Sequence, residues 1–246
     1  MKGAQLSRFL DPRAYVRRSS RELTALRDAA RLRRAYPKLS EYANLARPKH
    51  AVVARHMQEY LSRVSDELNA ISAKLAVFLW VLCEVTRPER ILDLGSGFSS
   101  LVFRHYIRIT EPRPEVYSVD DDPRWLDKTR EFLHSRDLSV AHLFTWDDFL
   151  AQEQEQFDLV LHDLGKMDKR IRTLSSVLSL VGRDGMLILD DVHKKTYGAY
   201  VRTTLREAGY GFYDLSRYTK DRFGRFAMLA IHNDPPVEID RQGSVG

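Results

Sequence analysis

The sequence predicts an α/β fold, a doubly wound and mostly parallel sheet of seven strands with a helical extension at the N-terminus. From residue 90 onward, short apolar segments alternate with helical stretches, which is typical of a parallel sheet with crossover helices. The first of these segments runs into a Gly-x-Gly turn at Gly95 and Gly97. The last two are separated by only about ten residues, too few for a helical crossover, so we expect the last strand to be antiparallel.

The region before the sheet is predicted to be helical. Pro37 and Pro48 punctuate an arginine-rich first part. Apolar residues then recur every three or four positions, which indicates an amphipathic helix with one buried face, at Val53, Met57, Tyr60, Val64, Leu68 and Ile71. A second, more uniformly apolar helix is expected from residue 72 to residue 85, ending near Pro88.

Strands and helices are then expected to alternate. The predicted strands are 91–94, 116–119, 140–144, 157–161, 186–189, 212–215 and 226–231. Helices are predicted at 99–109, 123–135, 168–181 and 196–208. These elements predict three parts, which are a basic helical extension (1–70), a sheet-forming domain (71–233) and a tail (234–246).

Composition and charge narrow the class of protein. The chain is 43% hydrophobic and 30% charged, as is usual for a soluble globular protein, and no apolar run reaches the roughly 18–20 residues of a membrane span. The first residues lack the apolar stretch of a secretory signal, and the single cysteine, Cys83, can form no internal disulfide. We therefore expect a cytoplasmic protein.

The positive charge is concentrated at the N-terminus. Residues 1–49 hold 13 Lys and Arg against 4 Asp and Glu, a net charge of +9, whereas the remaining residues hold 26 against 30, a net charge of −4. This asymmetry argues against a nucleic-acid-binding core, although a basic arm can still contact RNA, an anionic lipid or an acidic partner.

The turn after the first strand is a candidate ligand site. It reads Asp93-Leu94-Gly95-Ser96-Gly97, and such a turn lets a ligand approach the backbone and the positive end of the following helix. Ser100 stands where a dinucleotide-binding fingerprint has its third glycine. A Gly-x-Gly turn also occurs as a simple tight turn, so the motif needs support from other positions.

Acidic residues at the next two strand ends give that support. Asp120, with Asp121 as its substitute, can accept hydrogen bonds from ribose hydroxyls, or one of Asp120, Asp121 and Asp122 can cap the helix that begins at Pro123. At the third strand end, Asp147 can accept from an adenine amino group while Trp146 packs on the ring; an aspartate there can also be an N-cap.

With these motifs in this order, residues 71–231 resemble class I S-adenosylmethionine-dependent methyltransferases. The resemblance implies that the turn holds the methionine part of the cofactor, that the second strand end holds the ribose and that the third flanks the adenine. The implied cofactor contacts are Asp93, Gly95, Ser96, Gly97, Ser100, Asp120, Asp121, Trp146, Asp147 and His162.

Three carboxylates are expected at the fourth and fifth strand ends. Asp163, Asp190 and Asp191 should converge there, because both ends open onto the same crevice. Lys166 is the one obvious cation nearby, and clustered carboxylates repel, so we expect Mg²⁺ or another divalent cation to neutralise them. The segment resembles metal-dependent O-methyltransferases related to the catechol and caffeoyl-CoA enzymes, which Asp163, Lys166 and Asp190 match. Asp191 stands where those families usually have Asn.

The resemblance implies methyl transfer from S-adenosylmethionine to a hydroxyl group of a small molecule, which the basic extension suggests is acidic. Lys166 or His193 is expected to remove the hydroxyl proton with the help of the metal. We also expect a homo-oligomer. Two alternatives stay open. One is a nucleic-acid or protein methyltransferase that docks through the basic arm, although the Asp/Asn-Pro-Pro-aromatic motif of amino-directed enzymes is absent after the fourth strand. The other is a non-enzymatic interaction scaffold.

Overall fold

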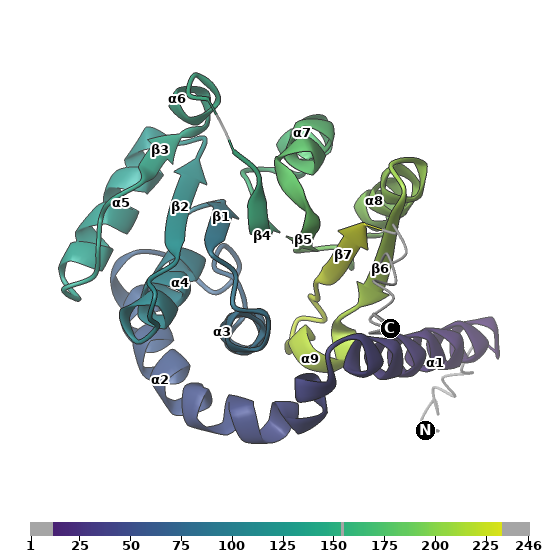
Figure 1. Ribbon diagram of the computed structural model, residues 1–246. Helices are drawn as coiled ribbons and strands as arrows, with labels where there is room; N and C mark the ends of the chain where they lie inside the picture. Colours follow the sequence, from purple (N-terminus) through teal and green to yellow (C-terminus); the bar gives the residue numbers. More distant parts are fainter. Residues whose placement is uncertain (1–11, 154, 233–246) are drawn as a thin grey trace, which may run out of the picture.

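The computed structural model describes residues 12–153 and 155–232, which form one seven-stranded sheet with helices on both faces (Figure 1). The sheet order is β3-β2-β1-β4-β5-β7-β6, and β7 runs antiparallel to both of its neighbours while the others run parallel. The predicted doubly wound fold with one antiparallel strand is therefore confirmed. The strands are β1 (Arg90–Leu94), β2 (Glu115–Asp120), β3 (Leu143–Thr145), β4 (Phe157–His162), β5 (Val181–Leu189), β6 (Tyr210–Asp214) and β7 (Met228–His232).

The helices divide between the two faces of the sheet. Side chains of β1 alternate, with Ile91 in one hydrophobic cluster and Leu92 in the other. Helices α1 to α5 and α9 contribute to the first cluster, and α6, α7 and α8 to the second. The helices are α1 (Pro12–Ala35), a 3₁₀ turn η1 (Pro37–Glu41), α2 (Tyr42–Arg63), α3 (Ala73–Thr86), α4 (Phe98–Arg108), α5 (Pro123–His134), α6 (Trp146–Leu150), α7 (Met167–Leu180), α8 (Lys195–Glu207) and α9 (Ser216–Thr219).

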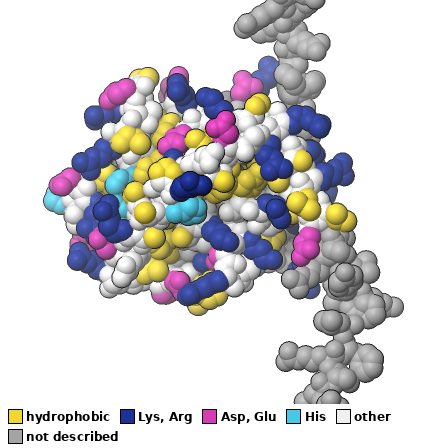
Figure 2. All heavy atoms as spheres, turned by 90° about the horizontal axis from the view of Figure 1, so that it is seen from below, with side chains coloured by type: hydrophobic (Ala, Val, Ile, Leu, Met, Phe, Trp, Pro, Cys, Tyr) yellow, Lys and Arg dark blue, Asp and Glu magenta, His cyan; other side chains and the backbone are white. Residues whose placement is uncertain are grey.

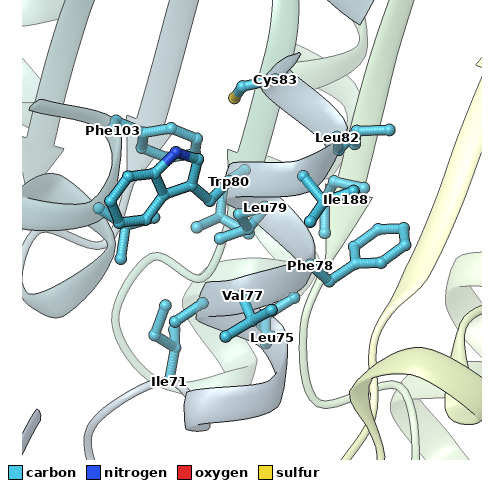
Figure 3. Close-up of a cluster of buried hydrophobic side chains, with 14 of the residues drawn as sticks. Ile71, Leu75, Val77, Phe78, Leu79, Trp80, Leu82, Cys83, Phe103 and Ile188 are labelled. Carbon is cyan, nitrogen blue, oxygen red and sulfur yellow. The ribbon is translucent and has the colours of Figure 1, made fainter. Parts of the chain in front are cut away.

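Helix α3 is apolar on all sides because it is covered on all sides. Ser72 caps its first turn by accepting a hydrogen bond from the amide of Leu75 (3.1 Å). Its side chains point around the whole helix axis, toward Phe103 of α4 on one side and Ile188 of β5 on another (Figure 3). Helix α2 packs on α3, and the pair is joined by an ion pair between Lys49 and Glu84 (2.8 Å).

The sequence prediction was wrong about where α2 begins and ends. Pro48 lies inside α2 rather than at a boundary. Because proline has no N–H, the carbonyl of Asn44 loses its helical hydrogen bond. Asn44 and Pro48 are both exposed, so water can donate to that carbonyl instead. The helix stops at Arg63, and Leu68 is 70% exposed instead of buried. The side chain of Asp66 accepts hydrogen bonds from the amides of Leu68 (2.8 Å) and the next residue, which forms a turn in place of another helical turn.

The third strand was also misplaced. It was predicted at 140–144, but β3 begins at Leu143. His142 has a left-handed backbone (φ +55°), which interrupts an extended strand. The carbonyls of Ser139 and Ala141 accept hydrogen bonds from the buried guanidinium of Arg104 (2.7 and 2.9 Å), so residues 139–141 are bound to α4. Pairing with β2 begins only at the carbonyl of His142, which accepts from the amide of Ser118 (2.9 Å).

Two further predictions concern the whole chain. Within the described residues, no helix is long and apolar enough to cross a membrane. The predicted tail at 234–246 lies outside the residues that the structure describes, as do residues 1–11.

Candidate active site

A cavity of about 760 Å³ opens where the carboxyl ends of four parallel strands meet. Each strand is followed by residues that line it. These are Gly95 and Ser96 after β1, Asp120, Asp121 and Asp122 at the end of β2, Asp163 and Gly165 after β4, and Asp190 and Asp191 after β5. The connection 68–71 between α2 and α3 forms another part of the wall. This is the crevice in which open α/β sheets bind ligands.

The turn after β1 requires glycine at its first position. Gly95 has φ +99°, and a Cβ atom there would lie 2.4 Å from the carbonyl oxygen of Asp163. Its amide donates to the carbonyl of Val119 (2.8 Å). The turn is therefore packed between the ends of β2 and β4, and this packing places Ser96 on the cavity wall.

Asp93 and Ser100 lie behind the turn and do not line the cavity. Asp93 is fully buried, and its Oδ2 accepts hydrogen bonds from the hydroxyls of Ser100 (2.5 Å) and Ser118 (3.0 Å). Arg104 donates to the same Ser118 hydroxyl (2.8 Å), and burial raises the pKa of Asp93. Gly97, the N-cap of α4, donates its amide to the Ser100 hydroxyl (3.1 Å). This network holds β1, β2 and α4 in the arrangement that forms the turn.

Asp120 faces the cavity, and its neighbours have other partners. Its carboxylate accepts from the Ser96 hydroxyl (3.0 Å) and the Asp122 amide (3.1 Å), and burial raises the pKa of Asp120 to about 6. Asp122 is the N-cap of α5, as the capping alternative predicted. Asp121 lies 3.6 Å from the amine of Lys169.

The residues predicted to flank adenine are not among those that line the cavity. Trp146 is buried against Phe149, and Asp147 is exposed on α6, whose N-cap is Thr145. His162 is fully buried with Nε2 3.0 Å from the hydroxyl of Thr173. Burial and the nearby Arg170 lower the pKa of His162 to about 3, so its ring is neutral.

An aromatic side chain that the sequence analysis missed does line the cavity. Trp125, in the first turn of α5, donates its indole N–H to the carbonyl of Ser96 (2.7 Å). This bond ties α5 to the glycine turn and places an aromatic ring beside Asp120 and Asp122 on the wall. An aromatic residue five positions after the acidic end of β2, Asp120, was the available sequence signal.

The three predicted carboxylates all line the cavity, together with a buried cation. Arg170 of α7, 7% exposed, forms ion pairs with Asp163 and with Asp191 (3.5 Å). The amine of Lys194 lies 2.6 Å from the same Asp191 oxygen, Oδ2. Burial raises the pKa of Asp163, and Asp190 and Asp191 add to the rise while Arg170 opposes it. Burial also raises the pKa of Asp190, and the negative charge of Asp191 adds a smaller rise.

Asp191 adopts a backbone conformation that few residue types tolerate. Its φ is +61°, in the left-handed region, where Asn and Asp are the commonest residues after glycine. Its amide donates to the side chain of Asp190 (2.7 Å). An aspartate therefore suits this position by its backbone conformation as well as by its charge.

As they are arranged, these residues do not fit a divalent cation. Across the described part of the chain, no group of three or more His, Cys, Asp or Glu side chains is placed to hold a metal ion. One oxygen of Asp163 and one of Asp191 face Arg170, and Lys194 shares the latter. Arg170 and Lys194 therefore supply positive charge at the place where the sequence analysis expected a metal.

The two predicted proton acceptors lie at different places. Lys166, the N-cap residue of α7, lines the cavity and is exposed. His193 is not among the lining residues; its Nδ1 lies 3.5 Å from Asp191 Oδ1, and its ring packs against Phe226. Burial lowers the pKa of His193, so its ring is neutral at pH 7.

Comparison with known proteins identifies the fold. No protein-family model matches the chain, and no curated protein matches its sequence. Solved structures of methyltransferases match its fold. One from Podospora anserina, bound to S-adenosylhomocysteine, has a TM-score of 0.59 at 15% identity over 74% of this chain and 88% of that one. The O-methyltransferase from Bacillus cereus, in complex with the same ligand, has a TM-score of 0.57 at 14% identity over 73% and 89%.

A third matching structure contains S-adenosylmethionine itself rather than S-adenosylhomocysteine. The O-methyltransferase from Streptomyces achromogenes involved in tomaymycin synthesis, in complex with S-adenosylmethionine, has a TM-score of 0.55 at 18% identity over 74% of this chain and 89% of that one. The chain therefore has the fold of class I S-adenosylmethionine-dependent O-methyltransferases, as the order of its motifs predicted.

Proposed function

We propose that this chain is a methyltransferase that uses S-adenosylmethionine to methylate a hydroxyl group of a small molecule. The observation that carries the proposal is one cavity of about 760 Å³, a volume typical of small-molecule sites. The glycine turn and Asp120 line it together with the Asp163, Asp190 and Arg170 cluster, so one space offers separate walls for a cofactor and an acceptor. Structures with this fold from three organisms contain the cofactor or its product.

The residues on the cavity wall suit the cofactor. The amino end of α4 and the backbone of the turn favour a negatively charged group such as a carboxylate. The Asp120 carboxylate has lone pairs beyond its two present partners, and it can accept from ribose hydroxyls. Trp125 adds an apolar ring to the same wall. When bound, S-adenosylmethionine supplies an electrophilic methyl group, so the chain has to align the acceptor and accept its proton.

Lys166 is our proposed proton acceptor. Of the two predicted candidates, it alone lines the cavity, whereas His193 is held against Asp191 and Phe226. We expect Lys166→Met to lower kcat by roughly 100-fold, the usual contribution of a general base, with little change in S-adenosylmethionine affinity. His193→Asn should change kcat much less. The reverse ranking in steady-state kinetics would assign the proton to His193.

Binding of S-adenosylhomocysteine tests the cofactor site before any acceptor is known. Isothermal calorimetry on the full chain should show one site, and Asp120→Ala should weaken it by about 1–3 kcal/mol, the scale of a charged hydrogen-bond partner. Asp127→Ala is the matched control, because Asp127 is an exposed carboxylate on α5 that pairs with Arg130. A folded chain that binds no S-adenosylhomocysteine would leave the non-enzymatic scaffold as the better reading.

The basic surface keeps the nucleic-acid or protein methyltransferase as the second candidate. Lys and Arg side chains are spread over the face formed by α1 and α2 (Figure 2), and those exposed there include Arg27, Arg33, Arg34, Lys38, Arg47 and Arg55. None of the described residues of α1 or α2 lines the cavity. Strong, salt-sensitive RNA binding that decreases when these arginines are replaced would favour this candidate. A homo-oligomer and a cytoplasmic location stay predictions.

A further inference from the structure

Arg170 occupies an unusual position for an arginine. It lies in the first turns of α7, where its own amide donates to the carbonyl of Lys166 (3.0 Å), and only 7% of it is exposed. A buried cation is costly unless it is paired and hydrogen-bonded. Arg170 meets this condition through an ion pair with Asp163, a second with Asp191 (3.5 Å), and a hydrogen bond from Nε to the carbonyl of Gly165 (3.3 Å).

The guanidinium joins the ends of two strands. Asp163 follows β4 and Asp191 follows β5, and each directs a carboxylate oxygen at a different nitrogen of Arg170. Lys194 adds a second cation at Asp191, while one oxygen of Asp190 accepts the Asp191 amide. The three carboxylates therefore lie around one buried cation, Arg170, with the half-exposed Lys194 beside Asp191.

A divalent cation would change this arrangement. Metal ligation needs several carboxylate oxygens turned toward one point, but here oxygens of Asp163 and Asp191 are turned toward Arg170. Even with all three carboxylates ionised, the cluster of Asp163, Asp190, Asp191, Arg170 and Lys194 has a net charge of only −1. A divalent ion would make it positive beside a guanidinium that remains charged at any ordinary pH. Arg170 and a metal ion therefore compete for the same oxygens.

We propose that Arg170 is the built-in cation of this cavity and takes the place of a divalent metal. The proposal rests on the proposed methyltransferase function and concerns the charge of the cavity wall at which the methyl acceptor would bind. Arg170 holds the ends of β4 and β5 together and neutralises their carboxylates. Three of the five guanidinium N–H groups donate to Asp163, Asp191 and Gly165. The other two can donate to the hydroxyl oxygen of the methyl acceptor, which gains negative charge as its proton leaves.

Binding of Mn²⁺ to the chelator-treated full chain is the direct test. We expect the wild type to show no saturable Mn²⁺ site by calorimetry up to about 1 mM, the range of weak carboxylate sites. Arg170→Ala should gain one site, because the three carboxylates lose their main cation. Adding Asp190→Asn to that variant should remove the gained site. Arg172→Ala is the matched control, since Arg172 lies two residues away, lines the same cavity and pairs with Asp168 (3.0 Å); it should gain none.

Thermal unfolding gives a second readout for the same variants. Mn²⁺ at about ten times its Kd should raise the Tm of Arg170→Ala by roughly 3 °C and leave the wild-type Tm unchanged. If Arg170→Ala does not fold, the wild-type titration decides: one Mn²⁺ per chain, lost in Asp190→Asn, overturns the proposal, and no saturable binding supports it. A folded Arg170→Ala without a metal site also overturns it. S-adenosylhomocysteine binding, measured on the same samples, tests the methyltransferase proposal separately.

Discussion

At the scale of single residues, Asp120 shows how a position suited to binding can cost stability. The carboxylate is 6% exposed, and burial raises its pKa from 3.8 to about 6. Between these two values the folded chain binds more protons at Asp120 than the unfolded chain does. The free energy of unfolding therefore falls as the pH rises through this window, and the full penalty is present above the folded pKa.

Removal of the charge should return part of that stability. We expect Asp120→Asn to raise the free energy of unfolding at pH 7.5 by about 1–3 kcal/mol, less whatever the altered bonds to Ser96 and Asp122 cost. At about pH 2.5, well below both pKa values, the carboxyl is protonated in both states, so the gain from removing the charge should vanish. Urea unfolding at both pH values measures this, and S-adenosylhomocysteine affinity should fall in the same variant. An equal gain at both pH values would show that charge burial is not the cause.

The part of the cavity wall that the strand ends form could be predicted from the sequence, because parallel strands end at the same edge. Gly95, Asp120 and Asp163 are examples: each follows an apolar strand that the sequence marks clearly, and each lines the cavity. Arg170 could not be predicted in this way. Whether a helical side chain turns back onto a strand end depends on where the helix starts and how it is tilted, and strand ends do not reveal either.

At the scale of elements, the positions of strands could be predicted more closely than the segments that connect helices and strands. The strand β1 was predicted to within one residue, since the run from Ile91 to Leu94 is apolar except for Asp93 and is followed by a glycine turn. The end of α2 was missed because Asp66 competes for backbone amides, and β3 was misplaced because Arg104 binds the chain before it. Both errors come from side chains that bind the backbone, which hydrophobic periodicity does not report.

The turn between β1 and α4 offers a test of close packing against backbone strain. Gly95 and Gly224 both have positive φ, +99° and +82°, but only Gly95 would place a Cβ against backbone atoms, while nothing lies within 4 Å of Gly224. Gly224→Ala should therefore cost about 1 kcal/mol from backbone conformation alone. Gly95→Ala should cost clearly more and weaken S-adenosylhomocysteine binding, because the turn must move away from Asp163. Equal losses in urea unfolding would mean that the turn accommodates the methyl group.

At the scale of the whole molecule, the N-terminal helices and the sheet share one core. Leu32 of α1, Leu39 of η1 and Tyr60 of α2 are each at most 1% exposed, and all belong to the cluster that contains α3 and one face of the sheet. The amide of Asp214 in β6 also donates to Asp28 of α1 (3.0 Å). The boundary near residue 70, predicted from the order of the elements, therefore divides segments that bury each other's apolar surface.

Deletion of residues 1–49, the basic segment, tests whether the rest of the chain folds without it. It removes fully buried leucines from a cluster that also covers α3, and a domain's net stability is only about 5–15 kcal/mol. We expect the truncated chain to lose its cooperative thermal transition. If the truncated chain unfolds at the wild-type Tm and still binds S-adenosylhomocysteine, the remaining residues fold and bind without the basic helices.

Point variants of the full chain separate the packing of α1 from its charge. Leu32→Ala should lower the free energy of unfolding by about 2–5 kcal/mol. Arg27→Gln with Arg34→Gln, both at exposed positions of α1, should change it by no more than about 0.5 kcal/mol.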